Sequence, residues 1–286
     1  MLRKSKGNMY GFVTHTYNPI KGKCTHNCCY CYMKRFPQRD LRIDGSEFKT
    51  DLGIDNYIFV GSSTDIFAED VKDEWIKKTF DKCKQHRNKY LFQSKNTMKM
   101  AHYVLLFPKN SVIGTTIETN RDYALSEAPN RKQRSVGLRE LGKSFETMVT
   151  IEPIFDFDLN EFVALIKEAR PKWVNIGADS NNKKDYKYPE PSQDKVIKLI
   201  EELKKFTDVR KKHNLNRLLP LAEQQEGGAL PTNIFELKQL KGLDKLRVNI
   251  ELRKQFDDRR KQRRELMKKN RKQATYARAV IKKLKT

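Results

Sequence analysis

Short apolar segments recur along the first two thirds of the chain, and segments with the apolar spacing of helices lie between them. Six apolar segments have the length and composition of β-strands. They cover residues 10–14, 57–60, 90–93, 112–117, 147–151 and 173–176. Two intervening segments, 71–86 and 160–169, carry apolar residues on one helical face. Strands that alternate with helices predict a parallel sheet with right-handed crossovers. We therefore expect an α/β fold, a partial (β/α)6 barrel of the TIM type.

The pattern changes in the last third of the chain. Residues 181–191 are rich in turn formers, and a helix is predicted from 194 to about 206. We assign residues 1–190 to the barrel and 191–252 to a helical extension of it. The remaining residues, 253–286, are expected to form a strongly basic amphipathic tail helix.

Charge is the main compositional feature. The 286 residues include 59 Lys or Arg and 36 Asp or Glu, a net charge of +23. The tail 253–286 holds 15 of the basic residues and three of the acidic ones, and so contributes +12. This excess favours an acidic partner, and nucleic acid is preferred to a membrane because no lipid-anchoring motif accompanies the charge. We expect the tail 253–286 to contact nucleic acid through phosphates; a solvated tail, or a helix that docks on the barrel, is the alternative. No apolar segment is long enough to cross a bilayer, and the first residues do not show the apolar stretch expected of a signal peptide. We expect a cytoplasmic protein without membrane contact, and its oligomeric state stays open.

Four of the five cysteines lie between positions 24 and 31. Cys24, Cys28 and Cys31 are separated by three and two residues, with Cys29 among them. In a reducing compartment, crowded thiols indicate metal binding rather than disulfides. Three thiolates on one loop can hold an iron–sulfur cluster and leave one iron open for a ligand.

Two other interpretations of these cysteines stay open. A zinc knuckle would combine three or four of the thiols with His26 or His15. A fully ligated electron-transfer cluster would take Cys29 or Cys83 as its fourth ligand. Cys83 falls on the apolar face of the predicted helix 71–86, which favours a buried small side chain.

Polar residues follow the predicted strands. They form the segments 61–65, 93–95, 116–121, 150–153 and 177–180. In β/α barrels the active site lies at the carboxyl ends of the strands. A barrel that served only as a scaffold would not need polar residues at all of these positions. The sequence therefore predicts a functional site at this end of the sheet.

The CxxxCxxC spacing, with Tyr30 before the last cysteine, resembles the radical S-adenosylmethionine superfamily. The resemblance implies that Cys24, Cys28 and Cys31 bind a [4Fe–4S] cluster whose open iron chelates S-adenosylmethionine, with Tyr30 near the adenine. It also implies that one-electron reduction cleaves the cofactor to a 5′-deoxyadenosyl radical. The electron would come from an external donor of the flavodoxin or ferredoxin type.

The strand-end segments are similar, in order and spacing, to a radical S-adenosylmethionine family common in phages, and more loosely to spore photoproduct lyase-like proteins. The residues that this resemblance assigns to the cofactor are Gly61, Ser62, Ser63, Asp65, Glu118 and Gly177. Gly61 to Ser63 would approach the amino group, Glu118 would reach the ribose hydroxyls, and Gly177 would lie beside the adenine.

Three further residues are expected to face the substrate: Lys95, Arg121 and Glu152. For each, an ion pair that stabilises the barrel rim is an equal alternative. The family usually has Gly-Gly-Glu-Ser after the sixth strand. Ala178 and Asp179 depart from that pattern, which leaves the role of Asp179 open.

Three hypotheses about function result. The first is an enzyme that cleaves S-adenosylmethionine reductively and abstracts hydrogen from a substrate, with nucleic acid or a nucleotide as the preferred substrate class. The second is a zinc-binding, nucleic-acid-binding protein without catalysis. The third is a cluster-bearing scaffold that binds S-adenosylmethionine without turning it over.

Overall fold

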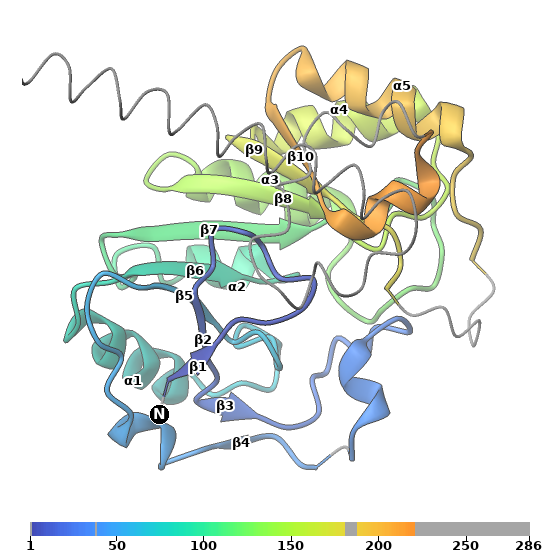
Figure 1. Ribbon diagram of the computed structural model, residues 1–286. Coiled ribbons are helices and arrows are strands. Elements are labelled where there is room, and N and C mark those ends of the chain that lie inside the picture. The colour runs from blue at the N-terminus through green and yellow to red at the C-terminus, as the bar shows by residue number, and fades with distance from the viewer. Residues whose placement is uncertain (1, 38, 181–187, 221–286) are drawn as a thin grey trace, which may run out of the picture. The chain divides into compact units, whose positions relative to one another are not determined.

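A sheet of eight strands forms the centre of the protein (Figure 1). The computed structural model describes residues 2–37, 39–180 and 188–220. In spatial order the strands are β1 (Arg3–Lys4), β2 (His15–Tyr17), β5 (Tyr57–Val60), β6 (Lys89–Gln93), β7 (Ser111–Thr116), β8 (Glu146–Ile151), β9 (Trp173–Ile176) and β10 (Asp208–Lys211). β1 pairs antiparallel with β2, and the other seven strands are parallel. Strand order follows chain order, as in a barrel built strand by strand.

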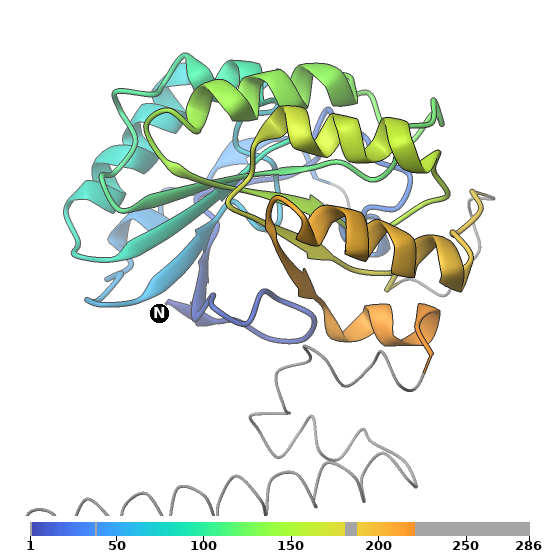
Figure 2. The same cartoon turned by 90° about the horizontal axis from the view of Figure 1, so that it is seen from above.

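The α-helices of the described residues, five in number, lie along one face of this sheet (Figure 2). They are α1 (Asp73–Lys84), α2 (Thr97–Ala101), α3 (Arg131–Leu141), α4 (Leu159–Ala169) and α5 (Gln193–Lys204). Three of them, α1, α4 and α5, fall in the segments where apolar spacing predicts helices. On α1 the buried residues include Ile76, Phe80 and Cys83. Cys83 is therefore a core side chain, at 0% exposure.

The strands place alternate residues on the two faces of the sheet. In β6, Tyr90 and Phe92 belong to the main core beneath the helices, whereas Leu91 belongs to a second cluster on the opposite face. The buried members of this second cluster are Tyr10, Val13, Leu91, Val112, Met148 and Trp173. Burial on both faces explains why these parallel strands read as continuous apolar segments.

The first predicted strand is wrong in position. Residues 10–13 form a turn, in which Val13 N–H donates to the Tyr10 carbonyl oxygen at 2.9 Å, and the strand is β2. The ring of Phe12 stacks on Tyr10 and meets the edge of Trp173. The apolar residues of this segment therefore pack against the inner face of the sheet. Their burial explains why the segment has the apolar composition of a strand without being one.

The other five predicted strands are confirmed, and three of them begin one residue earlier than expected. β10 was not predicted, because it is short and polar; it pairs in parallel with β9. The α/β partial-barrel fold is thus confirmed, with seven parallel strands instead of six, and the sheet continues past residue 190. Residues 221–252 of the expected extension, and the tail 253–286, lie outside the described residues.

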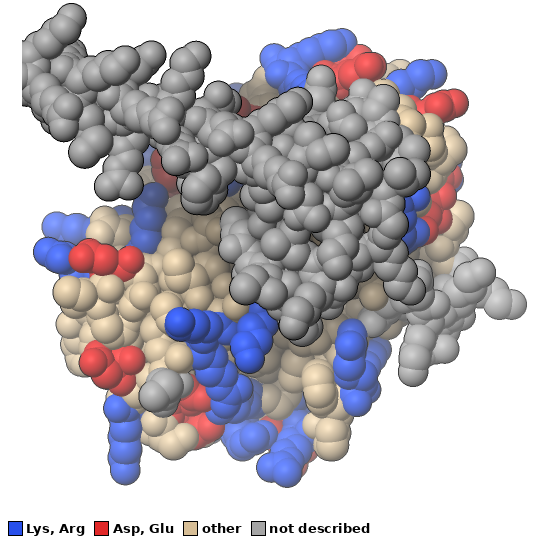
Figure 3. Space-filling model, viewed as in Figure 1, with Lys and Arg blue, Asp and Glu red and all other residues tan. Residues whose placement is uncertain are grey.

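A small antiparallel pair, β3 (Ile20–Lys21) with β4 (Arg42–Ile43), stands apart from the main sheet. Three 3-10 helices complete the described elements: η1 (Tyr32–Arg35), η2 (Glu47–Lys49) and η3 (His213–Leu218). Figure 3 shows that Lys and Arg side chains gather over the region of β1, β3 and β4, with few Asp or Glu among them. Within the described ranges, no helix combines the length and the apolar character that spanning a membrane requires.

Candidate functional site

The four clustered cysteines lie in a long loop closed at its base, residues 22–41, which we name the cysteine hairpin. β3 and β4 pair at that base, and Lys23 N–H donates to the Arg39 carbonyl oxygen at 2.8 Å. A Cβ atom on Gly22 would lie 2.3 Å from the Asp40 carbonyl oxygen, so only glycine permits this close approach. Below the base, Lys21 Nζ contacts carboxylates of Asp44 and Glu47 at 2.7 Å each. Both ends of the hairpin are therefore held in place by the β3–β4 pair and by the ion pairs of Lys21.

The thiols of the hairpin fit an iron–sulfur cluster in number and chemistry. All four are free, and two turns shape the loop: Asn27 N–H donates to the Cys24 carbonyl and Cys31 N–H to the Cys28 carbonyl, at 3.2 Å each. Burial raises the pKa of Cys24 to about 12 and also raises the pKa of Cys28. Since thiolates are the ligands, the charge of bound iron would have to replace these protons.

Across the described ranges, no three Cys, His, Asp or Glu side chains surround a single point as ligands of one metal ion would. The thiolates that hold a cubane bind different iron atoms, so they do not have to meet at one point. The fourth thiol of the hairpin belongs to Cys29, whose N–H donates to the Leu125 carbonyl oxygen at 2.9 Å. That bond connects the hairpin to the segment that follows β7.

Asp65 connects the hairpin to the ends of β5 and β6. Its Oδ2 accepts hydrogen bonds from Ser94 Oγ and Lys95 N, both at 2.9 Å, and His26 Nε2 lies 2.9 Å from the same oxygen. Its Oδ1 accepts from Phe67 N at 3.0 Å. Burial alone would raise the pKa of Asp65, but His26 and the N–H donors lower it to about 2. The carboxylate is thus ionised and engaged by the protein itself, which suits a residue that positions the hairpin.

A second buried network lies at the end of β7. Glu118 is fully buried and accepts a hydrogen bond from the Tyr30 hydroxyl. Arg134 Nη1 donates to both of its oxygens, at 3.0 and 3.3 Å, and Lys95 Nζ lies 3.9 Å away. Burial would raise the pKa of Glu118, but the charges of Arg134 and Lys95 hold it below its usual range. Lys95 Nζ also lies 5.4 Å from the centre of the Tyr30 ring.

The segment after β5 makes a tight turn beside the hairpin. Gly61 has φ +79°, and a Cβ atom there would lie 2.6 Å from Ile66 Cγ2. Ser62 Oγ donates to Asn18 Oδ1 at 3.2 Å, and Ser63 N–H donates to the same oxygen at 3.1 Å. The glycine is therefore required by the turn itself, and the two serines are held by a buried asparagine.

Glu152, at the end of β8, has protein partners on both carboxylate oxygens. Lys212 Nζ donates to Oε2 at 2.5 Å, while Asn214 Nδ2 and Asn8 Nδ2 donate to Oε1 at 2.8 and 2.6 Å. A Cβ atom on Gly177 would lie 2.7 Å from Oε1, so the glycine gives room to this carboxylate. The ends of β8, β9 and β10 and the N-terminal segment thus meet at Glu152.

Arg121 lies in an ion-pair network beyond the end of β7. Its guanidinium pairs with Asp156 and with Asp158, the latter at 2.8 Å. Asp158 is the N-cap residue of α4. The structure therefore gives Arg121 a local contact that holds the start of α4, in keeping with the ion-pair alternative.

The residues of these networks that sequence reasoning missed include Arg134, Lys212 and Asn214. Arg134 lies on α3, whose polar sequence has no continuous apolar stripe, although its buried face includes Ser135 and Gly137. Lys212 and Asn214 follow β10, which was not predicted. The capping box at Asn130 was a usable signal for the start of α3.

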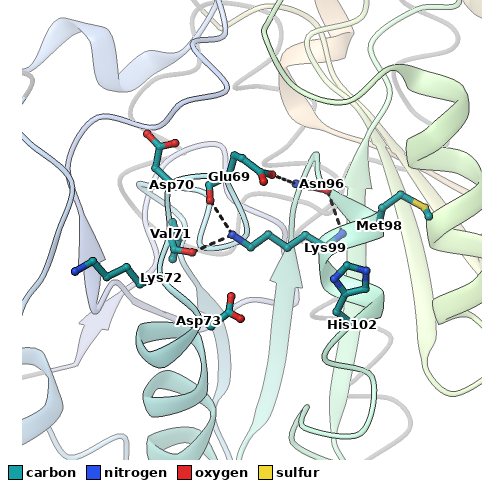
Figure 4. A pocket seen from close by; sticks show the side chains of 9 residues that line it. All are labelled: Glu69, Asp70, Val71, Lys72, Asp73, Asn96, Met98, Lys99 and His102. Atoms are coloured by element: carbon teal, nitrogen blue, oxygen red, sulfur yellow. Dashed lines mark hydrogen bonds between the residues drawn. The ribbon is translucent and has the colours of Figure 1, made fainter.

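An open pocket of about 590 Å³ lies beside α1 and α2 (Figure 4). Its lining residues are Glu69, Asp70, Val71, Lys72, Asp73, Asn96, Met98, Lys99 and His102. Lys99 Nζ points into the loop before α1 and donates to the carbonyl oxygens of Ala68, Glu69 and Val71 at 2.9–3.0 Å. None of the residues predicted for the cluster, cofactor or substrate lines this pocket.

No family model and no curated protein matches this sequence. Its fold is shared with solved structures of spore photoproduct lyase. A variant with bound AdoMet and dinucleoside spore photoproduct is 10% identical, with a TM-score of 0.54 over 71% of this chain and 78% of the other. Another variant is 12% identical, with a TM-score of 0.53 over 72% and 79%. A complex with dinucleoside spore photoproduct is 11% identical, with a TM-score of 0.53 over 71% and 78%. The likeness establishes the partial TIM-type barrel as the common fold.

Proposed function

We propose that this protein is a radical S-adenosylmethionine enzyme. The observation that carries the proposal is the place of the cysteine hairpin, whose free thiols have CxxxCxxC spacing. His26 and Tyr30 connect it to Asp65 and Glu118, which follow β5 and β7. A structure of the same fold holds AdoMet, which supports a cofactor of this kind. A [4Fe–4S] cluster bound to the hairpin would supply the electron that cleaves the sulfonium and yields a 5′-deoxyadenosyl radical.

The protein itself would orient the cofactor and the substrate. Cys24, Cys28 and Cys31 are the proposed ligands of the cluster. Asp65 and Glu118 hold the hairpin in place through His26 and Tyr30, so we assign them a positioning role. The turn from Gly61 to Ser63 and the backbone at Gly177 remain the proposed cofactor contacts.

Lys95 and Glu152 are the proposed substrate-facing residues. Both are mostly buried but keep some exposure, 16% and 17% for the side chains. Arg121 is the third proposed substrate-facing residue; its guanidinium also pairs with Asp156 and Asp158. We propose nucleic acid or a nucleotide as the substrate class, on the strength of the net charge of +23. An external one-electron donor and a cytoplasmic location belong to the same proposal.

The test is anaerobic reconstitution of the cluster, followed by S-adenosylmethionine and dithionite and detection of 5′-deoxyadenosine. Cys28→Ala should lose both the iron chromophore and the product. Cys29→Ala is the matched control from the same loop and should keep both. Wild-type protein that holds iron but forms no 5′-deoxyadenosine with any reductant would contradict the enzymatic proposal. Stoichiometric zinc without iron would instead favour the zinc-binding hypothesis.

A further inference from the structure

We propose that the cysteine hairpin binds single-stranded nucleic acid through its exposed side chains, namely two aromatic rings and several cations. This inference rests on the proposed function in one respect: the bound strand would be delivered as substrate only if the protein is the proposed enzyme. Its basis is a combination of exposed aromatic rings and exposed cations on one short loop, directly beside the candidate cofactor site.

The aromatic rings are the first observation. Among the described residues, the strongly exposed large apolar side chains are Tyr32, Phe36, Ile54, Met98 and Leu105. The two aromatic ones, with exposed fractions of 46% and 50%, both lie on the hairpin, in η1 and at its C-cap. The strongly exposed aromatic side chains of the described residues thus lie on one short loop, four residues apart, where they can contact a partner.

The charge of the hairpin is the second observation. Residues 22–41 include four Lys or Arg and one acidic residue, Asp40, and Arg42 follows directly as the first residue of β4. Lys23, Lys34, Arg39 and Arg42 are exposed, and none of the four forms an ion pair with a carboxylate of the described residues. By contrast, Lys21, at the base of the hairpin, forms ion pairs with Asp44 and Glu47. The exposed cations are therefore available to an anionic partner.

The two observations together point to a single strand of nucleic acid. Cations attract phosphates, and aromatic rings offer faces on which unpaired bases stack. A duplex keeps its base faces buried, so it could use the cations but not the rings. An acidic protein could also use the cations, but regularly spaced phosphates beside unpaired base faces are a property of a single strand.

The hairpin surface adjoins the candidate cofactor site. Cys31 is the N-cap residue of η1, so the proposed third cluster ligand directly precedes Tyr32. The Tyr32 hydroxyl donates to the Ser62 carbonyl oxygen at 3.0 Å, which connects η1 to the turn after β5. A strand stacked on these rings would therefore lie next to the turn that we assign to the cofactor.

Binding can be measured with the full-length, cluster-loaded protein and a fluorescein-labelled single-stranded DNA of about 12 nucleotides, within the usual site size. At raised salt, where phosphate contacts fade, Phe36→Ala and Tyr32→Ala should each weaken binding about five- to 100-fold. Tyr32→Phe keeps the ring and should bind like wild type, as should Leu105→Ala. Lys34→Ala should reduce the slope of log Kd against log salt by about 0.7. Lys77→Ala, an exposed lysine on α1, is its control.

Photo-crosslinking with 5-iodouracil in the same oligonucleotide locates the contact, and we expect it at Tyr32 or Phe36. Ring variants that bind like wild type, with crosslinks confined to 253–286, would overturn the inference. So would ring variants that lose only turnover driven by a protein electron donor, because the surface would then be a protein docking site. Iron content confirms that each variant is loaded. Intact binding without 5′-deoxyadenosine would count against the proposed function alone.

Discussion

Replacing Arg134 with methionine tests the buried network beneath the cysteine hairpin. The side chains of Arg134 and Glu118 are 3% and 1% exposed. Besides the Glu118 carboxylate, the guanidinium donates to the carbonyl oxygens of Thr116 at 3.0 Å and Pro129 at 2.7 Å. Methionine retains an unbranched apolar side chain but removes all of these bonds. Of the cations in the described residues, Glu118 would then keep Lys95 nearby, at 3.9 Å.

The cost follows from the charge that is left behind. Removing one partner of a buried ion pair typically costs about 3–5 kcal/mol, because the other charge stays buried without compensation. We expect Arg134→Met to lower the free energy of unfolding by that amount at neutral pH. Glu118→Gln removes the stranded charge. The double variant should therefore lose less than the sum of the two single variants, with a coupling energy of about 1–3 kcal/mol.

Urea denaturation followed by tryptophan fluorescence measures these changes, since Trp75 and Trp173 both lie in the described fold. Arg139→Met is the matched control on the same helix. Its partners, Glu140 and Glu168, are about 40% exposed, so we expect a loss below about 1 kcal/mol. If Arg134→Met lowers the free energy of unfolding by no more than Arg139→Met does, the buried-pair interpretation is refuted. Strict additivity in the double variant would refute it as well.

Two further predictions concern the turn after β5. Because the pKa of Asp65 is about 2 instead of the usual 3.8, its ionised form stabilises the fold by about 2 kcal/mol above pH 4, and this is lost as the pH falls through 2. Asp65→Asn should flatten that part of the stability profile in acid unfolding followed by circular dichroism; an unchanged profile would contradict the assignment. Gly61→Ala should cost about 1–3 kcal/mol in urea, because φ is +79° and Ile66 occupies the Cβ position. Gly11→Ala, where the Cβ meets nothing within 4 Å, should be nearly neutral, and equal losses would argue against the strained turn.

Apolar periodicity was sufficient for most of the sheet, because strands buried on both faces carry few polar residues. Apolar periodicity failed where the composition of a segment does not match its environment in the fold. Residues 10–14 are aromatic and apolar, yet they pack as a turn against the inner face of the sheet. β10 is polar, yet pairing with β9 makes it a strand. Helix α3 buries a charged residue, Arg134, so its pattern hides its inner face.

The sequence by itself determined the candidate ligands, since the spacing of Cys24, Cys28 and Cys31 is a local property of one loop. It also indicated which end of the sheet carries polar residues. Only the tertiary structure decided which charges meet: Arg134 with Glu118, and Lys212 with Glu152, 60 residues away along the chain. Strand order and helix packing bring such partners together. A pattern of residues along the chain does not show which distant residues become neighbours in the fold.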